Sequence, residues 1–289
     1  MRNIRLTVAY DGTDFHGWQY QKGNTIRTVQ GVLVTAMEKL TGGTLEAGTF
    51  QILGSSRTDT GVHALGQVAS VWTESAIPID SFARALNANL PGDAFVVKAE
   101  EVPLEFHPIQ DTERKRYRYL IQDGPAPELF LRRYAWRMGK LTATRLDAEK
   151  MAEGARYLLG THDFSALENI GSPRTSSVRT ILDVSVRRGT AEHRDREERE
   201  SLFLPLVGRA EDFIEIEVEA DGFLYNMVRN IAGTLMEVGR GTHSPEWLGE
   251  LVESRNRALA GPTAPPQGLY LLWIRFAKSG KKTDFCENS

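Results

Sequence analysis

Residues 3–10 read NIRLTVAY and alternate polar with apolar side chains. Ile4, Leu6 and Val8 fall on one side of this stretch, and the residues between them fall on the other. Because successive side chains of a β-strand point to opposite faces of the sheet, the alternation predicts a strand with one buried face. This strand opens the series of elements that decides the fold class.

The rest of the first half continues this series. The sequence predicts, in chain order, a helix over 29–40, strands near 44–52 and over 67–73, a helix over 81–89 and a strand over 94–100. Gly42 and Gly43 predict the end of the first helix, and Ser81 is expected to cap the second. The resulting order, β-α-β-β-α-β, is the split β-α-β plan of ferredoxin-like domains.

The second half repeats the same plan. Its expected elements are a strand over 116–122, a helix over 146–159, strands over 180–187 and 213–219, helices over 224–238 and 245–253, and a strand over 268–276. We therefore expect an α+β protein of two ferredoxin-like domains, residues 1–105 and 106–276, with a mainly antiparallel sheet. A central cleft between the halves would be a usual place for a functional site.

Two segments lack this periodicity. Residues 187–200, RRGTAEHRDREERE, are densely charged, which is typical of a solvated and mobile hairpin extension. We expect the whole charged insertion to cover 188–210. Residues 277–289 form a tail that is expected to be frayed.

Composition excludes several classes of protein. The 289 residues are 41% hydrophobic and 25% charged, with no apolar run long enough to span a membrane and no secretory signal expected at the N-terminus. The one cysteine, Cys286, excludes a disulfide framework and fits a reducing cytoplasm. The net charge of −3 counts against a generally basic nucleic-acid binder, but residues 112–139 hold seven cations and three anions. A basic patch of this kind can still dock a polyanion.

The stretch 54–64, GSSRTDTGVHA, holds two charged residues, Arg57 and Asp59, among small ones. One interpretation is a surface turn, since Gly, Ser, Thr and Asp are common in turns. The other is an active-site loop whose small residues let a large ligand approach. Arg229, in the otherwise apolar segment LYNMVRNIAG, lies either at a helix edge or beside an acid, whose ionised form it would favour.

The stretch 115–119, KRYRY, places Tyr117 and Tyr119 on one face of a strand and Arg116 and Arg118 on the other. The tyrosines could pack in a core and the arginines could face solvent. Alternatively, the stretch could form a stacking platform for unpaired nucleobases beside a phosphate-binding row. The six histidines lack metal-ligand spacing, and no phosphate-binding glycine motif occurs. An enzyme of this sequence is therefore expected to use a carboxylate, without metal or cofactor.

Five blocks together resemble the TruA-type tRNA pseudouridine synthases. They are, in chain order, YDGTDFHGWQYQ, SRTDTGVHALGQV, NANLPGD, KRYRY and NMVRNIAGTLMEVG. Their order and spacing match over roughly residues 3–276, apart from the charged insertion. The resemblance implies the pseudouridine synthase fold, a homodimer and a cofactor-free isomerisation of uridine in the anticodon stem-loop of tRNA.

The resemblance also implies roles for single residues. Asp59 would be the catalytic nucleophile, and Arg57 would help to displace the target base from its stack. Tyr117 would stack on the flipped uracil, and Arg229 would pair with Asp59. The target base must leave the helix for this chemistry, and an aromatic face and an inserted arginine would offset the cost. Attack at C6 of the base, attack at C1′ of the sugar, and a route through a glycal all stay open.

The sequence departs from the family pattern at residues 106–110, FHPIQ, where the family has an arginine soon after Phe-His. The predicted RNA contacts are Arg114, Lys115, Arg116 and Arg118, with further support from Arg132, Arg133, Arg174 and Arg179. Three alternatives stay open. They are a non-catalytic RNA-binding protein, a pseudouridine synthase acting on another RNA, and a metal-dependent hydrolase built on Asp11, Asp14 and Asp59.

Overall fold

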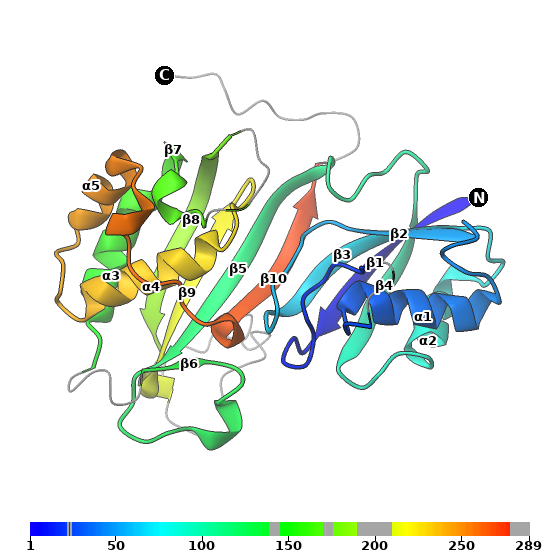
Figure 1. The fold of residues 1–289 in the computed structure, drawn as a ribbon, viewed down its shortest axis with the longest axis horizontal. Coiled ribbons are helices and arrows are strands. Elements are labelled where there is room, and N and C mark those ends of the chain that lie inside the picture. The colour runs from blue at the N-terminus through cyan, green and yellow to red at the C-terminus, as the bar shows by residue number, and fades with distance from the viewer. Residues whose placement is uncertain are drawn as a thin grey trace. The chain divides into compact units, whose positions relative to one another are not determined.

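The computed structural model describes residues 1–21, 23, 25–138, 145–169, 171, 176–189 and 210–277 (Figure 1). The chain divides into two compact units. One comprises Met1–Lys115 with the residues from Tyr270 on, and the other comprises Arg116–Leu269. The first unit therefore extends past residue 105, the predicted domain boundary, and includes most of the last strand.

The first unit has the predicted β-α-β-β-α-β order. Its elements are β1 (Arg2–Tyr10), α1 (Val29–Thr41), β2 (Phe50–Gly54), β3 (His63–Thr73), α2 (Ile79–Asn87) and β4 (Ala94–Val102). Strand β1 pairs antiparallel with β3 and β4, and β2 pairs antiparallel with β3. The resulting order β4-β1-β3-β2 places β1 and β2 on either side of β3, as the split β-α-β plan requires. Strand β10 (Leu269–Phe276) pairs parallel with the start of β3, where Tyr270 lies opposite His63.

The second unit repeats the alternation of strands and helices. Its elements are β5 (Thr112–Gln122, the first residues of which belong to the first unit), β6 (Trp136–Arg137), α3 (Ala148–Ala155), β7 (Gly160–Asp163), β8 (Val178–Arg188), β9 (Phe213–Ala220), α4 (Met227–Gly239) and α5 (Trp247–Ser254), with short 3-10 turns between them. Strand β9 lies between β5 and β8, and β7 pairs antiparallel with β8. The strand pairing of the protein is thus mainly antiparallel, and the predicted α+β class is confirmed.

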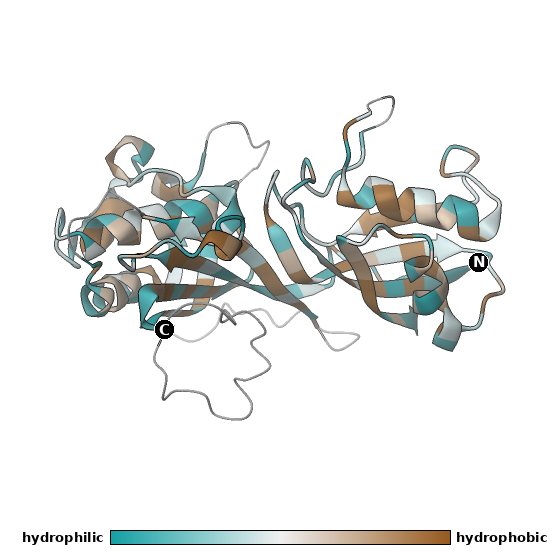
Figure 2. Ribbon diagram, turned by 90° about the horizontal axis from the view of Figure 1, so that it is seen from below, coloured by the Kyte–Doolittle hydropathy of each residue, from teal (hydrophilic) through white to brown (hydrophobic). Residues whose placement is uncertain are grey.

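The buried faces follow the sequence periodicity. Ile4, Leu6 and Val8 are fully buried, as their alternation in NIRLTVAY predicted. In β9, Ile216 and Val218 are also fully buried. Figure 1 shows α4 crossing in front of the strands of the second unit, and Figure 2 shows hydrophobic and hydrophilic residues interspersed along helices and strands, as expected for elements with one buried face.

The strand predicted near 44–52 is shorter than expected and begins at Phe50. Before it, the chain turns at Gly48, whose φ of 70° is in the left-handed region. The hydroxyl of Thr49 donates to the carbonyl of Thr44 at 2.9 Å, which closes the turn. Local side-chain hydrogen bonds of this kind compete with strand formation, so only the last residues of the predicted strand join the sheet.

Helix starts also differ from the prediction. Ser81 does not cap α2, because the helix begins two residues before it, at Ile79, with Pro78 at the N-cap position. Helix α3 begins two residues later than predicted, since the side chain of Asp147 accepts a hydrogen bond from the amide of Lys150 and caps it. Helix α4 begins only after Asn226, which has a φ of 59°.

Most of the charged insertion predicted over 188–210 and all but the first residue of the predicted tail lie outside the described residues. The first two residues of the charged run belong to the sheet, because β8 continues through Arg188. The Arg188 guanidinium donates to both carboxylate oxygens of Asp123, at 2.8 and 2.7 Å. Within the described ranges, no helix is long and apolar enough to cross a membrane.

Candidate active site

The Asp59 loop, residues 55–62, connects the antiparallel strands β2 and β3. It turns tightly after Asp59, whose carbonyl accepts from the amide of Val62 at 3.2 Å, while Gly61 has a φ of 79°. A side chain at that φ would be strained, so glycine suits the turn. Arg57 is exposed, and Asp59 is partly exposed. The loop thus presents a cation and a carboxylate two residues apart on a short, constrained segment.

A second loop, residues 11–18, supports the Asp59 loop through close backbone contact. The amide of Trp18 donates to the carbonyl of Thr58 at 3.1 Å. The amide of Gly61 donates to the carbonyl of Phe15 at 3.2 Å. A Cβ atom on Gly17 would lie 2.6 Å from the Thr58 carbonyl oxygen, and one on Gly12 would lie 2.0 Å from that of Val62. Only glycine permits this approach. Sequence reasoning missed this role, although both glycines stand in the quoted block YDGTDFHGWQYQ.

The start of the Asp59 loop is held by side chains from two strands. Gln67, fully buried in β3, accepts from the amide of Ser56 at 3.3 Å and donates to its carbonyl at 2.7 Å. Lys115 of β5 donates its ammonium to the carbonyl of Ser55 at 2.9 Å. Lys115 was predicted to contact RNA, and this bond gives it a direct part in holding the loop. Its RNA contact stays a prediction.

His63 lies at the end of the same loop, with its ring stacked on Tyr270 at a centroid separation of 4.8 Å. Its Nδ1 accepts from the amide of Gly12 at 3.0 Å and lies 3.2 Å from an oxygen of Asp11. That Asp11 oxygen also accepts from the amide and hydroxyl of Thr13. Asp11 and His63 therefore organise the supporting loop. Among the described residues, no group of three or more His, Cys, Asp or Glu side chains is placed to hold a metal ion.

Tyr117 and Arg229 belong to the second unit, whereas Arg57 and Asp59 belong to the first. Tyr117 is 6% exposed, and Phe223 meets its ring edge-on at a centroid separation of 5.1 Å. Edge-to-face aromatic contacts favour one ring orientation. The next tyrosine on this face, Tyr119, is fully buried and donates its hydroxyl to the carbonyl of Pro265 at 2.7 Å. Tyr119 thus has the core-packing role that the sequence left open.

Arg229 lies in the first turn of α4 and is partly buried. Its Nε donates to the carbonyl of Ala264 at 2.7 Å, and one terminal nitrogen donates to the side-chain oxygen of Asn226 at the same distance. Asn226 adopts the left-handed conformation that asparagine tolerates better than most residues. Because Asn226 is both the helix cap and a partner of Arg229, the backbone at this point fixes the guanidinium.

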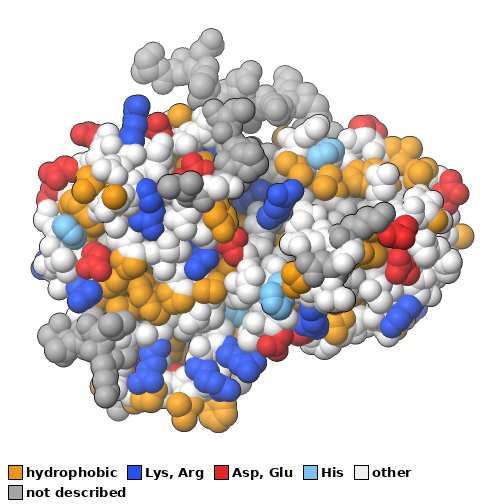
Figure 3. All heavy atoms as spheres, viewed as in Figure 1, with side chains coloured by type: hydrophobic (Ala, Val, Ile, Leu, Met, Phe, Trp, Pro, Cys, Tyr) orange, Lys and Arg blue, Asp and Glu red, His pale blue; other side chains and the backbone are white. Residues whose placement is uncertain are grey.

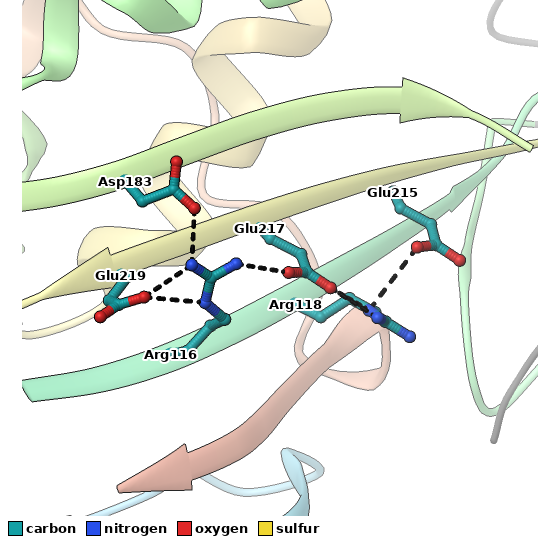
Figure 4. A network of polar contacts seen from close by, with 6 residues as sticks. All are labelled: Arg116, Arg118, Asp183, Glu215, Glu217 and Glu219. Carbon is teal, nitrogen blue, oxygen red and sulfur yellow. Dashed lines mark hydrogen bonds and ion pairs between the residues drawn. The ribbon is translucent and has the colours of Figure 1, made fainter. Parts of the chain in front are cut away.

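Arg116 and Arg118 lie on the opposite face of β5 from Tyr117, as the alternation predicted, but they meet carboxylates there (Figure 4). The guanidinium of Arg116 contacts Asp183, Glu217 and Glu219, and that of Arg118 contacts Glu215 and Glu217. These ion pairs give both arginines partners within the fold, and their contact with RNA phosphates stays a prediction. Arg114, the remaining predicted contact on this strand, is partly exposed.

Other predicted basic residues lie on a more open segment between β5 and β6. Arg132 and Arg133 are exposed there, beside Leu129 and Phe130, whose exposed fractions are 64% and 73%. Figure 3 shows cationic and hydrophobic side chains gathered along the lower edge of the molecule, where Figure 1 draws this segment. Arg174 lies outside the described residues.

The structure is thus an α+β fold of two such units, with a carboxylate and an arginine on a constrained loop. Comparison with known proteins identifies its class. The model of a family described as tRNA pseudouridine synthase matches residues 6–110 and 155–277. The chain therefore belongs to the tRNA pseudouridine synthase family, whose members are isomerases that act on tRNA.

Relatives cover nearly the whole chain. A protein named tRNA pseudouridine synthase A from Thermoanaerobacter sp. (strain X514) is 44% identical over 274 residues, which are 95% of this chain and 99% of the relative. One of the same name from Acetivibrio thermocellus is 43% identical over 276 residues, 96% of this chain and 100% of the relative. The resemblance seen in the five sequence blocks is confirmed.

Proposed function

We propose that this protein converts uridine to pseudouridine in the anticodon stem-loop of tRNA, with Asp59 as the nucleophile. In this reaction the bond between C1′ and N1 breaks, the base rotates, and a bond forms between C1′ and C5. The hydrogen on C5 leaves as a proton, and N1 gains one, so the product is an isomer of the substrate. The reaction needs no redox step, metal or nucleotide.

The constrained Asp59 loop carries this proposal. A nucleophile needs a fixed position, and the contacts from Gly12, Gly17 and Gln67 hold the backbone on both sides of Asp59. Arg57 extends from the same loop into solvent, which suits a side chain that must enter an RNA helix and take the place of a displaced base.

The second unit supplies the remaining roles in this proposal. Tyr117 would stack on the displaced uracil, since base–aromatic stacking offsets part of the cost of leaving the helix. Arg229 would pair with Asp59 and keep it ionised, because a nearby cation favours the charged form of a carboxylate. Its orientation by Asn226 supports this role.

For tRNA docking we favour the exposed arginines Arg132 and Arg133, together with Arg114. We also propose the homodimer and the cytoplasmic location that the family resemblance and a tRNA substrate imply. Light scattering on the purified protein would test the dimer, whose predicted mass is twice the 32.3 kDa of the chain.

The test of the proposed function is tritium release from tRNA labelled at C5 of uridine, in EDTA and without added nucleotide. The wild type is expected to release tritium, and Asp59→Asn is expected to release none while binding tRNA within about an order of magnitude of the wild type. Asp14→Asn is the matched control, because Asp14 is an exposed acid on the neighbouring loop and a ligand in the hydrolase alternative. It should retain activity.

Each alternative predicts a different result. A metal-dependent hydrolase would stop in EDTA and would cleave the RNA. A non-catalytic RNA-binding protein would bind tRNA without releasing tritium. Release only from an RNA other than tRNA would overturn the proposed substrate. Release by Asp59→Asn at the wild-type rate would remove Asp59 from the chemistry.

A further inference from the structure

The face of β5 opposite Tyr117 carries a network of paired opposite charges (Figure 4). We refer to the six residues as the β5 charge network. They are Arg116 and Arg118 of β5, Asp183 of β8, and Glu215, Glu217 and Glu219 of β9. The network joins the three strands by side chains, in addition to their backbone pairing.

Arg116 is the centre of the network. Its Nε donates to Glu219 at 3.1 Å and its two terminal nitrogens donate to Glu219 at 2.6 Å, Glu217 at 2.9 Å and Asp183 at 2.5 Å. Its side chain is 20% exposed, and that of Glu219 is 7% exposed. Burial by itself would lower the pKa of the Arg116 guanidinium, but hydrogen bonds to the three carboxylates outweigh it and raise this pKa above the ordinary value.

Glu217 links the two arginines. One of its oxygens accepts from Arg116 at 2.9 Å, and the other accepts from Arg118 at 2.9 and 2.5 Å. The side chain of Arg118 is only 10% exposed and that of Glu217 is 16% exposed. Charge pairs held at this depth are geometrically specific, and removing one partner leaves a buried charge uncompensated.

The sign of the charge within the β5 charge network disfavours a phosphate contact at Arg116 and Arg118. Among the six residues there are four carboxylates and two guanidiniums, a formal net charge of −2. An RNA phosphate approaching either arginine would meet these carboxylates, and like charges repel. Arg116 and Arg118, which the sequence suggested as part of a phosphate-binding row, therefore form ion pairs with acids of β8 and β9.

Tyr117 stands between the two arginines in the chain and points to the other face of the strand. A strand whose side chains are fixed on one face cannot rotate or slip without breaking those contacts, since a slip of one residue exchanges the two faces. On its own face Tyr117 meets Phe223 edge-on. The Tyr117 ring is thus in aromatic contact on its own face, and ion pairs hold the neighbouring residues of the strand on the other face.

We propose that Arg116 and Arg118 are positioning residues for the isomerase, which act through the carboxylates of β8 and β9 to hold Tyr117 in place for the displaced uracil, and that they do not bind RNA phosphates. This rests on the stacking role of Tyr117 proposed above. It changes the role assigned to the two arginines from substrate binding to orientation of a neighbouring side chain.

The first experiment compares steady-state kinetics of Arg116→Gln with those of Arg156→Gln, which removes an exposed arginine from the same unit. For Arg116→Gln we expect kcat to fall about 10- to 100-fold and KM to stay within about twofold, because small misplacements of a positioned group are costly to rate. The slope of log Kd for tRNA against log salt should equal that of the wild type. A lost phosphate contact would instead raise KM and reduce the slope by about 1, which would overturn the proposal.

Glu217→Gln gives the sharper discrimination, because the two roles predict opposite signs. If the arginines position Tyr117, removing this acid lowers kcat and does not tighten tRNA binding. If they bind phosphates, removing an acid beside them strengthens tRNA binding. Near-ultraviolet circular dichroism and the thermal midpoint identify any variant that fails to fold. In that case Arg116→Lys, which keeps the charge but loses the planar fork, is expected to show the same fall in kcat at unchanged KM.

A double-variant cycle separates this inference from the proposed function. If Arg116 acts through Tyr117, then Arg116→Gln has no further effect on kcat in a Tyr117→Ala background. If the losses in kcat of the two single variants multiply in the double variant, the positioning role of Arg116 is overturned. If Tyr117→Ala itself leaves kcat at the wild-type value, the stacking role of Tyr117 fails, whatever the arginine variants show.

Discussion

The hydroxyl of Tyr10 lies 2.7 Å from the hydroxyl of Thr58, at a buried position. This bond joins the end of β1 to the residue that precedes Asp59. Either hydroxyl can be the donor, so one donates and the other accepts. The first strand of the fold and the proposed nucleophile are thereby linked through a single pair of side chains.

Tyr10→Phe should therefore disturb the Asp59 loop without changing the core. We expect the free energy of unfolding to fall by about 1 kcal/mol, because a buried hydroxyl of Thr58 loses its partner. The value of kcat should fall while KM stays near that of the wild type. Urea unfolding and steady-state kinetics measure the two effects. Tyr157→Phe, at a tyrosine with 41% exposure, is the control and should change neither. A Tyr10→Phe enzyme of full kcat would show that this bond does not position Asp59.

Gly17→Ala should impair catalysis more than its backbone strain accounts for. Gly17 and Gly42 both have positive φ, at 86° and 70°, so alanine at either position should cost about 1–2 kcal/mol of stability. Only at Gly17 would the new Cβ also meet the Thr58 carbonyl oxygen; at Gly42 nothing lies within 4 Å. We expect both variants to unfold at lower urea concentration, and only Gly17→Ala to lose kcat. Equal kcat in the two variants would rule out a role for the close contact in holding the loop.

The fold was predictable from the sequence where periodicity was strong. The alternation of NIRLTVAY and the helical spacing that ends at Gly42 gave β1 and α1 nearly residue by residue. Short elements were missed, because Trp136–Arg137 and Gly160–Asp163 are too brief to establish a period. The turn at Gly48 was missed because its closing bond, between Thr44 and Thr49, competes with a strand pattern that the sequence also shows.

The candidate site was predictable in part. The loop with Arg57 and Asp59 is marked by its local composition, which a linear reading can detect. The partners of Arg116 could not be found this way, because Asp183 and Glu219 are 67 and 103 residues away in the chain. Net charge over a window counts cations but not the acids that adjacent strands bring to them. The basic window 112–139 therefore does not show which of its cations pair with acids from other strands.

Asn226→Gly should separate the backbone role of Asn226 from its role as a partner of Arg229. Glycine tolerates the φ of 59°, so the helix start should survive. The side-chain oxygen that accepts from Arg229 at 2.7 Å is lost. We expect stability to change by less than about 1 kcal/mol, and kcat to fall because the guanidinium is less well oriented.

Arg255→Gly provides the matched control for this variant, since Arg255 is the other described non-glycine residue of positive φ, at 52°. Its exposed ion pair with Asp163 is 3.5 Å long and contributes little. Relief of strain should leave Arg255→Gly at least as stable as the wild type, with unchanged kcat. If Asn226→Gly also keeps full kcat, the bond to Arg229 has no part in catalysis.

The helix cap Asp147 should make part of the stability depend on pH. A hydrogen bond from the amide of Lys150, at 3.0 Å, lowers the pKa of the Asp147 carboxyl below its ordinary value of 3.8. The folded state therefore holds this proton less tightly than the unfolded state. The charged cap contributes its full stabilisation above the unfolded pKa, and this is lost as pH falls through the folded pKa.

Asp147→Asn keeps a capping oxygen but cannot titrate, so the stability difference between wild type and Asp147→Asn should be largest at pH 5.5 and above and shrink below about pH 4. Asp147→Ala should lose about 1 kcal/mol at neutral pH. Urea unfolding at pH 7, 5.5, 4.5 and 3.5 measures these differences, and a wild-type advantage over Asp147→Asn that is the same at every pH would show that the ionised carboxylate does not contribute to the cap.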